Sequence, residues 1–175
     1  MEEKPHYNIV SSETTHIGRF DIVYDSIEKN GELHPYSYVK MKNAVAILGF
    51  CGEKVVLLRQ YRYIWDQWFW EVPGGAVEDG EDITIAARRE FTEETGFKIS
   101  SIKYLGTCYP SIGATTELQH LFVAECEEAF DQNTDALEKI NVVLVDVEEF
   151  KRMIRNNEFN HGMGLAIWAR YEVEK

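Results

Sequence analysis

The residues of this sequence best suited to chemistry are three glutamates in the segment GGAVEDGEDITIAARREFTEETGF, residues 74–97. Glu90, Glu93 and Glu94 are three and four positions apart, so on a helix their carboxylates lie within about one quadrant of its surface. Like charges at these spacings repel, and each glutamate near a helix C-terminus costs about 0.3–1 kcal/mol. A solvated acidic face is one interpretation. Convergent carboxylates also suit a hard divalent cation, Mg²⁺ or Mn²⁺, which would offset both penalties, and we favour this second interpretation.

A helix over residues 83–95 is the element that must position these carboxylates. Its apolar residues at helical spacing are Ile83, Ala86, Ala87 and Phe91. Asp82 is suited to cap its start, and Gly96 to the left-handed residue that ends it. Gly74 and Gly75 follow an expected strand and allow the backbone close to a metal or phosphates. Because Mg²⁺ takes few protein carboxylates and adds phosphate oxygens, the segment predicts chemistry on a phosphorylated substrate.

The same segment resembles the Nudix box, Gly-x5-Glu-x7-Arg-Glu-U-x-Glu-Glu-x-Gly-U, where U is a bulky apolar residue. The specified positions are filled in register by Gly75, Glu81, Arg89, Glu90, Glu93, Glu94 and Gly96, and Phe91 and Phe97 stand at the U positions. The resemblance implies a Nudix hydrolase that uses Mg²⁺ or Mn²⁺ to cleave a nucleoside diphosphate linked to another group. The fold it implies is α+β, an α/β/α sandwich with a mixed central β-sheet.

The resemblance also implies roles for individual residues of the segment. Glu90 and Glu94 look like the principal metal ligands, and the carbonyl of Gly74 like a further one. Glu93 looks like another ligand or a water-orienting base, and Arg89 like a charge-balancing residue that holds the carboxylates. For the catalytic base from a loop before the last strand, Glu138 is the first choice and Asp135 the second. The alternative for Glu138, which lies next to Lys139, is a solvated loop acid.

Other stretches resemble the ADP-ribose pyrophosphatase branch of this family. These are VVLLRQYRY (55–63), WEVPGG (70–75) and YPSIGATTELQHLFVAE (109–125), with Pro110 near the branch's marker proline and Ile112 replacing another proline. By this resemblance, Arg62 is a pyrophosphate contact, Glu71 touches or supports the substrate, and Glu117 lies near the terminal ribose. Arg62 as a surface ion-pair residue and Glu117 as a solvated loop acid are the alternatives.

Length and composition set the expected organisation and surroundings of the chain. Its 175 residues suit one compact domain, in which we expect an N-terminal β-arm over 1–42, used for dimerisation, and a Nudix hydrolase domain over 43–175. A formal net charge of −12 disfavours nucleic acid and anionic membrane surfaces as partners. No apolar run reaches the roughly 18 residues of a membrane span. Three scattered cysteines and the absence of a signal-like start favour a soluble, cytoplasmic protein.

Periodicity and turn residues predict a mixture of strands and helices. Expected strands are 44–50, 54–60, 68–72, 102–109, 119–126 and 140–146, and expected helices are 83–95, 147–156 and about 164–173. In the arm, strands 20–26 and 36–41 flank EKNGELHP, a loop that looks longer than a two-residue hairpin turn. The aromatic run 61–70 favours sheet packing, with stacking of an exposed Trp65 or Trp68 on a base as the alternative.

The function expected from this reading is hydrolysis of ADP-ribose to AMP and ribose 5-phosphate by a homodimer. A GDP-mannose or UDP-sugar pyrophosphatase is the nearest alternative within the enzymes. A non-catalytic Nudix-fold protein that senses such a nucleotide is the alternative from another functional class. The intact motif and the absence of a basic helix-turn-helix segment favour the enzyme.

Overall fold

The computed structural model describes residues 5–127, 132 and 139–175 of the chain. The chain divides into two compact units. The larger is Asn43–Pro110 with Leu118–Lys175, and the smaller is Met1–Lys42 with the loop Ser111–Glu117. Glu138 and Asp135, the expected catalytic bases, lie outside the described residues.

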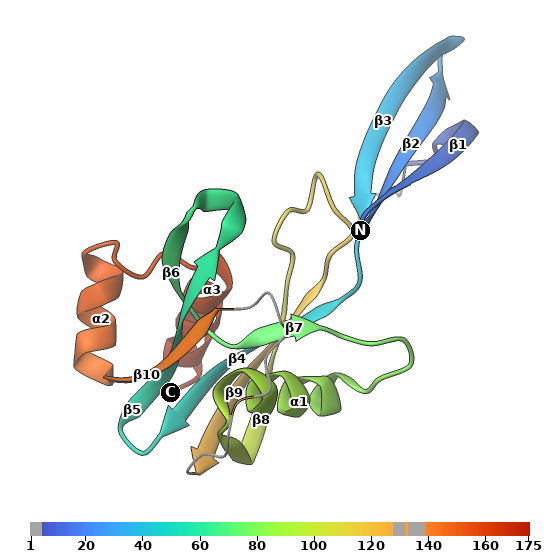
Figure 1. Ribbon diagram of the computed structural model, residues 1–175. Helices are drawn as coiled ribbons and strands as arrows, with labels where there is room; N and C mark the ends of the chain where they lie inside the picture. Colours follow the sequence, from blue (N-terminus) through green and yellow to red (C-terminus); the bar gives the residue numbers. More distant parts are fainter. Residues whose placement is uncertain (1–4, 128–131, 133–138) are drawn as a thin grey trace. The chain divides into compact units, whose positions relative to one another are not determined.

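The larger unit is built on a mixed β-sheet, as expected (Figure 1). Its described strands are β4 (Ala44–Cys51), β5 (Lys54–Arg62), β6 (Gln67–Glu71), β7 (Gly74–Ala76), β8 (Lys98–Cys108), β9 (Gln119–Glu127) and β10 (Ile140–Asp146). They follow the order β10-β5-β4-β9-β8, with β6 paired to β5 and β7 paired to β4. The β4–β9 pair is parallel and the other pairs are antiparallel.

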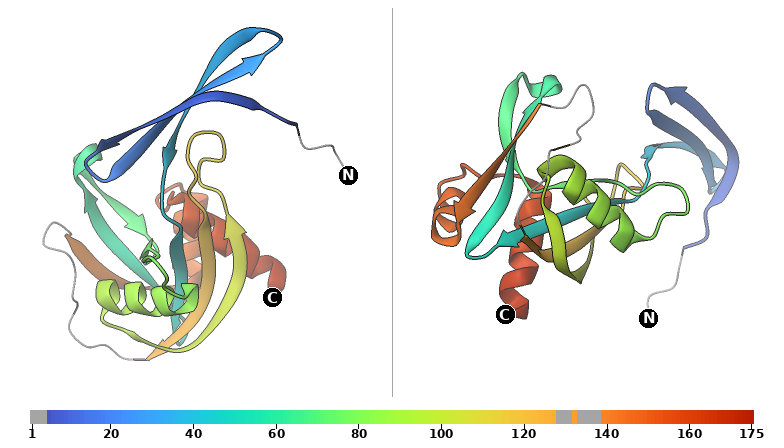
Figure 2. Two further views of the ribbon diagram at one scale, coloured as in Figure 1. Left: turned by 90° about the vertical axis from the view of Figure 1, so that its right-hand side faces the viewer. Right: turned by 60° about the horizontal axis from the view of Figure 1, so that its bottom comes forward.

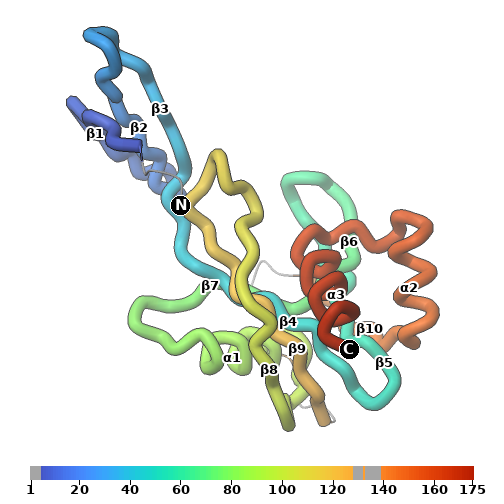
Figure 3. Tube along the Cα trace, turned by 180° about the vertical axis from the view of Figure 1, so that it is seen from behind, coloured from blue at the N-terminus to red at the C-terminus, as the bar shows by residue number. Residues whose placement is uncertain are grey.

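Helices cover both faces of this sheet and form two separate cores. Helix α1 (Ile83–Thr95) lies on one face, while α2 (Val147–Arg155) and α3 (Gly162–Glu174) lie on the other, as Figure 1 and the reverse view of Figure 3 show. Strand β4 supplies both cores by alternation. Val45 and Ile47 pack with the α1 residues, whereas Ala46, Leu48 and Phe50 pack with those of α2 and α3. The α/β/α arrangement predicted from the sequence is therefore confirmed.

Burial on both faces explains why the central strands read as continuous apolar runs. Ala44 to Phe50 is buried throughout, and Val55 to Leu58 is at most 1% exposed. Gly49 has a packing reason, because a Cβ there would lie 2.5 Å from the ring of Phe91 on α1. The helix that carries the glutamates can therefore lie close against the sheet.

The smaller unit contains a three-stranded antiparallel sheet in the order β1-β2-β3 (Figure 2). Its strands are β1 (Asn8–Ile17), β2 (Phe20–Lys29) and β3 (Glu32–Lys40), of which β1 was not predicted. The prediction that the loop between β2 and β3 is longer than a two-residue turn was wrong. Lys29 pairs with Glu32, and Asn30 and Gly31 take positive φ angles of 57° and 81°, which makes a two-residue hairpin turn.

The aromatic run divides between the core and the surface. Trp70 packs against the core on the α2 and α3 side, as expected for a sheet position. Trp65, in the 3-10 turn Tyr63–Trp65, is 64% exposed, and Trp68 is 39% exposed. The expectation of core packing was thus wrong for these two tryptophans. Among the described residues, the helices lack the combination of length and apolar character that crossing a membrane requires.

Candidate active site

Helix α1 begins and ends at the residues that the sequence indicated. The Asp82 carboxylate accepts hydrogen bonds from the backbone N–H groups of Thr84 and Ile85, at 2.8 and 3.3 Å. Gly96 ends the helix in the left-handed region at φ 73°. With both ends fixed and Ala86, Ala87 and Phe91 buried, the helix presents its glutamates at defined positions.

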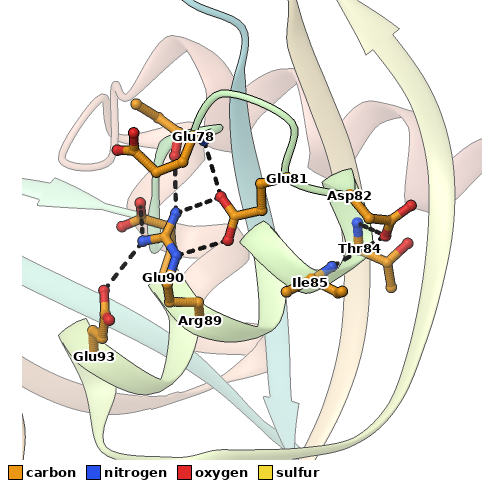
Figure 4. A network of polar contacts seen from close by, with 9 residues as sticks. Glu78, Glu81, Asp82, Thr84, Ile85, Arg89, Glu90 and Glu93 are labelled. Atoms are coloured by element: carbon orange, nitrogen blue, oxygen red, sulfur yellow. Dashed lines mark hydrogen bonds and ion pairs between the residues drawn. The ribbon is translucent and has the colours of Figure 1, made fainter.

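Arg89 is the centre of the polar network on this helix (Figure 4). Its guanidinium donates to both carboxylate oxygens of Glu81, from Nε and Nη2, at 2.9 Å each. Nη1 donates to Glu90 Oε1 at 2.7 Å and to Glu93 Oε2 at 3.2 Å, and Nη2 also donates to the carbonyl of Ala76 at 3.1 Å. One cation therefore fixes three carboxylates and ties the helix to β7.

This network changes the electrostatic argument drawn from the sequence. Hydrogen bonding to Glu81 raises the pKa of Arg89, and the Arg89 guanidinium lowers the pKa of Glu81 to about 2. The repulsion between Glu90 and Glu93 is therefore offset in part by Arg89, and a metal is not the whole compensation. The charge-balancing role expected of Arg89 agrees with these contacts.

Glu90 and Glu94 both point at the short strand β7. Glu94 is 6% exposed, and its Oε2 accepts a hydrogen bond from the backbone N–H of Gly74 at 2.8 Å. A Cβ at Gly75 would lie 2.3 Å from Oε2 of Glu90, so that carboxylate occupies the space a side chain would fill. Gly75 thus leaves room for the carboxylate of Glu90, whereas a Cβ at Gly74 would lie 2.2 Å from the carbonyl oxygen of Val45, so Gly74 allows β7 to lie close to β4.

The register of β7 directs the backbone N–H and C=O of Gly74 toward the edge of the strand that faces Glu94. Ile47 N donates to the carbonyl of Pro73, and Gly75 opposes Val45 on β4. In an antiparallel pair the residue between two hydrogen-bonded positions directs its own N–H and C=O away from the partner strand. The carbonyl of Gly74 therefore faces away from β4, on the edge where Glu94 binds the N–H.

These groups fit a hard divalent cation in their chemistry. Carboxylate and carbonyl oxygens are the ligands that Mg²⁺ and Mn²⁺ prefer, and Glu90, Glu94 and Gly74 offer both kinds around one glycine pair. Across residues 5–127, 132 and 139–175, no three His, Cys, Asp or Glu side chains form a ready-made metal cage. A site with few protein ligands is the type that magnesium completes with water and substrate phosphate oxygens.

Arg62 and Glu71 form a paired unit at the ends of β5 and β6. Arg62 Nε donates to Glu71 Oε1 at 2.7 Å, and Nη2 donates to Glu71 Oε2 at 2.5 Å. The Glu71 side chain is 8% exposed, whereas that of Arg62 is 45% exposed. Arg62 therefore makes an ion pair whose partner is a buried carboxylate, and its contact with the substrate pyrophosphate stays a prediction. The forked geometry fixes the guanidinium while leaving part of it at the surface.

The remaining predicted site residues are placed as follows. Glu93 is 39% exposed and is the most accessible of the three α1 glutamates. Glu117 belongs to the smaller unit, where its N–H donates to Thr115 Oγ1 at 3.4 Å, and its role stays a prediction. Sequence reasoning missed Ala76, whose carbonyl binds Arg89, and His161, which contacts Val72 across 89 positions of the chain. No sequence signal connected either residue to the site.

Comparison with known proteins agrees with this fold and shows the family. The NUDIX domain family profile matches residues 40–163. A GDP-mannose pyrophosphatase of Enterobacter sp. (strain 638) is 32% identical over 87% of this chain and 86% of its own. An ADP-ribose pyrophosphatase of Bacillus subtilis (strain 168) is 29% identical over 79% of this chain and 77% of its own. Other curated relatives are matched over smaller shares of their length, 62% of one and 56% of another.

A solved structure described as an ADP compounds hydrolase has the same fold. The two chains superpose with a TM-score of 0.85, over 98% of this chain and 95% of the other, at 19% sequence identity. The chain belongs to the Nudix family. It is a Nudix pyrophosphohydrolase, one of a family of enzymes that act on small nucleotide substrates and generally use a divalent metal, commonly Mg²⁺.

Proposed function

We propose that this enzyme hydrolyses the pyrophosphate bond of ADP-ribose and releases AMP and ribose 5-phosphate. The observation that carries the proposal is the meeting of Glu90 and Glu94 at the Gly74–Gly75 backbone, within a domain similar to an ADP-ribose pyrophosphatase. The RQYR stretch that ends at Arg62 supports the same branch of the family.

In this proposal Glu90, Glu94 and the carbonyl of Gly74 hold Mg²⁺ or Mn²⁺. When bound, such a cation neutralises diphosphate oxygens and lowers the pKa of a coordinated water. Glu93 orients the attacking water, because it is the most accessible carboxylate of the cluster and Arg89 fixes its position. Arg89 keeps Glu90 and Glu93 in place before substrate arrives, which preorganises the site.

The substrate contacts proposed are Arg62, Glu71 and Glu117. Arg62 is held by both oxygens of Glu71, so its guanidinium meets the diphosphate in a fixed orientation. Glu117 contacts the terminal ribose, and Glu138 supplies the catalytic base, with Asp135 as second choice. These last three roles rest on the family resemblance, and substitution of each residue tests them.

GDP-mannose is the second candidate substrate. The relative that is 32% identical to this chain over 87% of its length is a GDP-mannose pyrophosphatase, and the alignment covers more of the chain than that with the ADP-ribose enzyme. The shape of the loops that hold the base and sugar decides between the two. The unbroken set of motif residues makes a non-catalytic sensor the weaker alternative.

A product assay tests these proposals directly. ADP-ribose, GDP-mannose and UDP-glucose are each incubated with Mg²⁺, with Mn²⁺ and with a chelator, and nucleoside monophosphate release is measured. We expect the highest kcat/KM for ADP-ribose and no turnover with the chelator. A higher kcat/KM for GDP-mannose would replace the substrate assignment. Tight binding without hydrolysis of any compound would support the sensor.

We also propose that the enzyme works as a homodimer joined through the β1–β3 sheet. Large apolar side chains on one face of this sheet are exposed, among them Ile17, Ile22, Tyr24 and Leu33. Such a surface marks an interaction site, and a second copy of the chain is the occupant we propose. Light scattering should give a dimer mass for the wild type and a monomer mass for Ile22→Glu. Lys29→Glu, at the exposed end of β2, serves as the control. A monomeric wild type would refute the dimer.

A cytoplasmic location remains a prediction from the sequence, and the three cysteines, Cys51, Cys108 and Cys126, are free thiols in the structure. This agrees with a reducing compartment. Fractionation of cells that express the tagged chain would test the location.

A further inference from the structure

The backbone that joins β6 to β7 leads into the candidate site. Val72 and Pro73 lie between Glu71, which ends β6, and Gly74, which begins β7. The carbonyl of Pro73 is satisfied by Ile47 N at 2.9 Å, and proline has no N–H. The N–H of Val72 must find another acceptor, because a buried backbone donor without one is costly. Val72 is 3% exposed.

His161, which precedes α3, supplies that acceptor. Its Nδ1 lies 3.2 Å from Val72 N. A backbone N–H can only donate, so Nδ1 carries the lone pair and the proton of the neutral ring is on Nε2. This contact fixes both the tautomer and the orientation of the imidazole.

The other ring nitrogen, Nε2, faces the Arg62–Glu71 pair, which is proposed above to contact the substrate. His161 Nε2 lies 3.9 Å from Oε2 of Glu71, the oxygen that also accepts from Arg62 Nη2. The imidazole thus spans from the backbone of Val72 to the carboxylate of the preceding residue. At 3.9 Å the Nε2–H and the carboxylate interact as dipole and charge, beyond the range of a good hydrogen bond.

We propose that His161 is a positioning residue that holds the β6–β7 connection, and with it the Glu71–Arg62 pair, in the geometry that binds the substrate diphosphate. It acts through Val72 and Glu71 and touches neither substrate nor metal. The segment from Glu71 to Gly75 is then held from two sides. His161 contacts it from the start of α3, and Glu94 binds Gly74 N from α1. The proposal depends on the proposed substrate contact of Arg62.

A role for His161 confined to helix α3 does not account for these contacts. His161 stands at the N-cap position of α3, but its side chain makes no capping hydrogen bond there. Its ring also lies 6.4 Å from that of Phe159, centroid to centroid, an edge contact that fixes no hydrogen-bonding atom. The polar atoms of the side chain are directed at β6 and its continuation.

The charge state of the ring agrees with this role. Burial lowers the pKa of His161, and the charged groups that face it act in opposite directions, Glu71 raising the pKa and Arg62 lowering it. The neutral ring, which accepts from Val72 N–H, therefore persists as the pH falls below the ordinary pKa of histidine. Protonation would turn Nδ1 into a donor and break that contact.

Three substitutions of His161 separate the contributions of the two ring nitrogens. His161→Ala removes both. His161→Asn keeps an oxygen acceptor close to the position of Nδ1, and His161→Gln keeps an amide closer to the position of Nε2. Arg170→Ala is the matched control, because Arg170 anchors α3 to the carbonyls of Leu105 and Thr107 on β8, away from Val72.

Amide hydrogen exchange of the peptide that covers residues 71–77 is the first measurement, and it needs no substrate. We expect faster exchange of that peptide in His161→Ala and His161→Gln, and exchange like the wild type in His161→Asn and Arg170→Ala. Exchange unchanged in His161→Ala, or accelerated equally in Arg170→Ala, would overturn the proposal. Because the readout is independent of turnover, it stands even if the wild type hydrolyses none of the nucleotides tested.

Steady-state kinetics with the nucleotide that the wild type turns over is the second measurement. His161→Ala should raise KM about fivefold, the ratio that one ordinary hydrogen bond supports, and change kcat less than twofold. His161→Asn should restore KM to near the wild-type value. We also expect the KM of the wild type to rise at low pH, where protonation of His161 breaks the contact with Val72, and the KM of His161→Asn to lack this rise. A fall in kcat at constant KM would overturn the positioning role, while a wild type without activity would refute the proposed function instead.

Discussion

Substitution of Gly75 by alanine tests whether the position of Glu90 determines activity. The added Cβ would lie 2.3 Å from Oε2, 2.4 Å from Cδ and 2.6 Å from Oε1 of Glu90. Ordinary contacts between such atoms are about 3.5 Å, so the carboxylate must move by about 1 Å. A misplacement of about 1 Å at a catalytic site costs on the order of 10²-fold in rate. We therefore expect Gly75→Ala to lower kcat about 100-fold.

The assay compares turnover and metal binding in Gly75→Ala and a matched variant. Gly162→Ala is the same chemical change at a position where no heavy atom lies within 4 Å, and it should keep wild-type turnover. Binding of Mn²⁺ measured by electron paramagnetic resonance should weaken in Gly75→Ala alone. Far-ultraviolet circular dichroism checks that both variants fold. Turnover within twofold of the wild type in a folded Gly75→Ala would refute the reasoning.

Three further predictions concern the helix α1 network. Glu94→Gln should abolish metal-dependent turnover but keep the melting temperature, because a glutamine oxygen can still accept from Gly74 N–H; full turnover in this variant would contradict the metal-ligand assignment. Arg89→Gln should raise the pKa of Glu81 from about 2 toward its ordinary value of 4.5, as followed by carboxyl carbon NMR, and an unmoved Glu81 would contradict the network. Because the folded-state pKa of Glu81 is depressed, its stabilisation is present above pH 4.5 and is lost as the pH falls toward 2. Between pH 4.5 and 2, denaturant unfolding should therefore show a steeper loss of stability in the wild type than in Arg89→Gln. Equal losses in the two proteins would contradict the ion pair between Arg89 and Glu81.

Local sequence signals predicted the regular elements because each signal acts over a few residues. Asp82 and Gly96 mark the ends of α1 through hydrogen bonding and a left-handed backbone, and both act within one helical turn. Strand β4 was recognised from a continuous apolar run, which burial on both sheet faces requires. Strand β1 was missed because its ten residues are all exposed, so no alternation of buried and exposed positions identifies it.

The contacts between distant segments could not be predicted from one sequence. The spacing of Glu90 and Glu94 showed that they share a face of α1, but not that this face meets Gly74 and Gly75 on β7. The sequence also did not predict that Arg89 partly neutralises Glu90 and Glu93, because all the surrounding groups together set the direction of a long side chain. The forked pair between Arg62 and Glu71 was not predictable either, because the register places Arg62 opposite Gln67 and Glu71 opposite Leu58, and the two side chains meet across this offset.

By itself, the sequence determined the family motif, the helix that carries it, and the kind of chemistry that carboxylates at such spacing perform. The tertiary structure alone decided that those carboxylates approach the backbone of β7 and that Arg89 holds them. It also brought His161 to Val72, which is 89 positions away in the chain. The physical reason is range: capping, periodicity and turn preferences act between neighbours in the chain, whereas sheet register and helix packing bring distant residues within hydrogen-bonding distance.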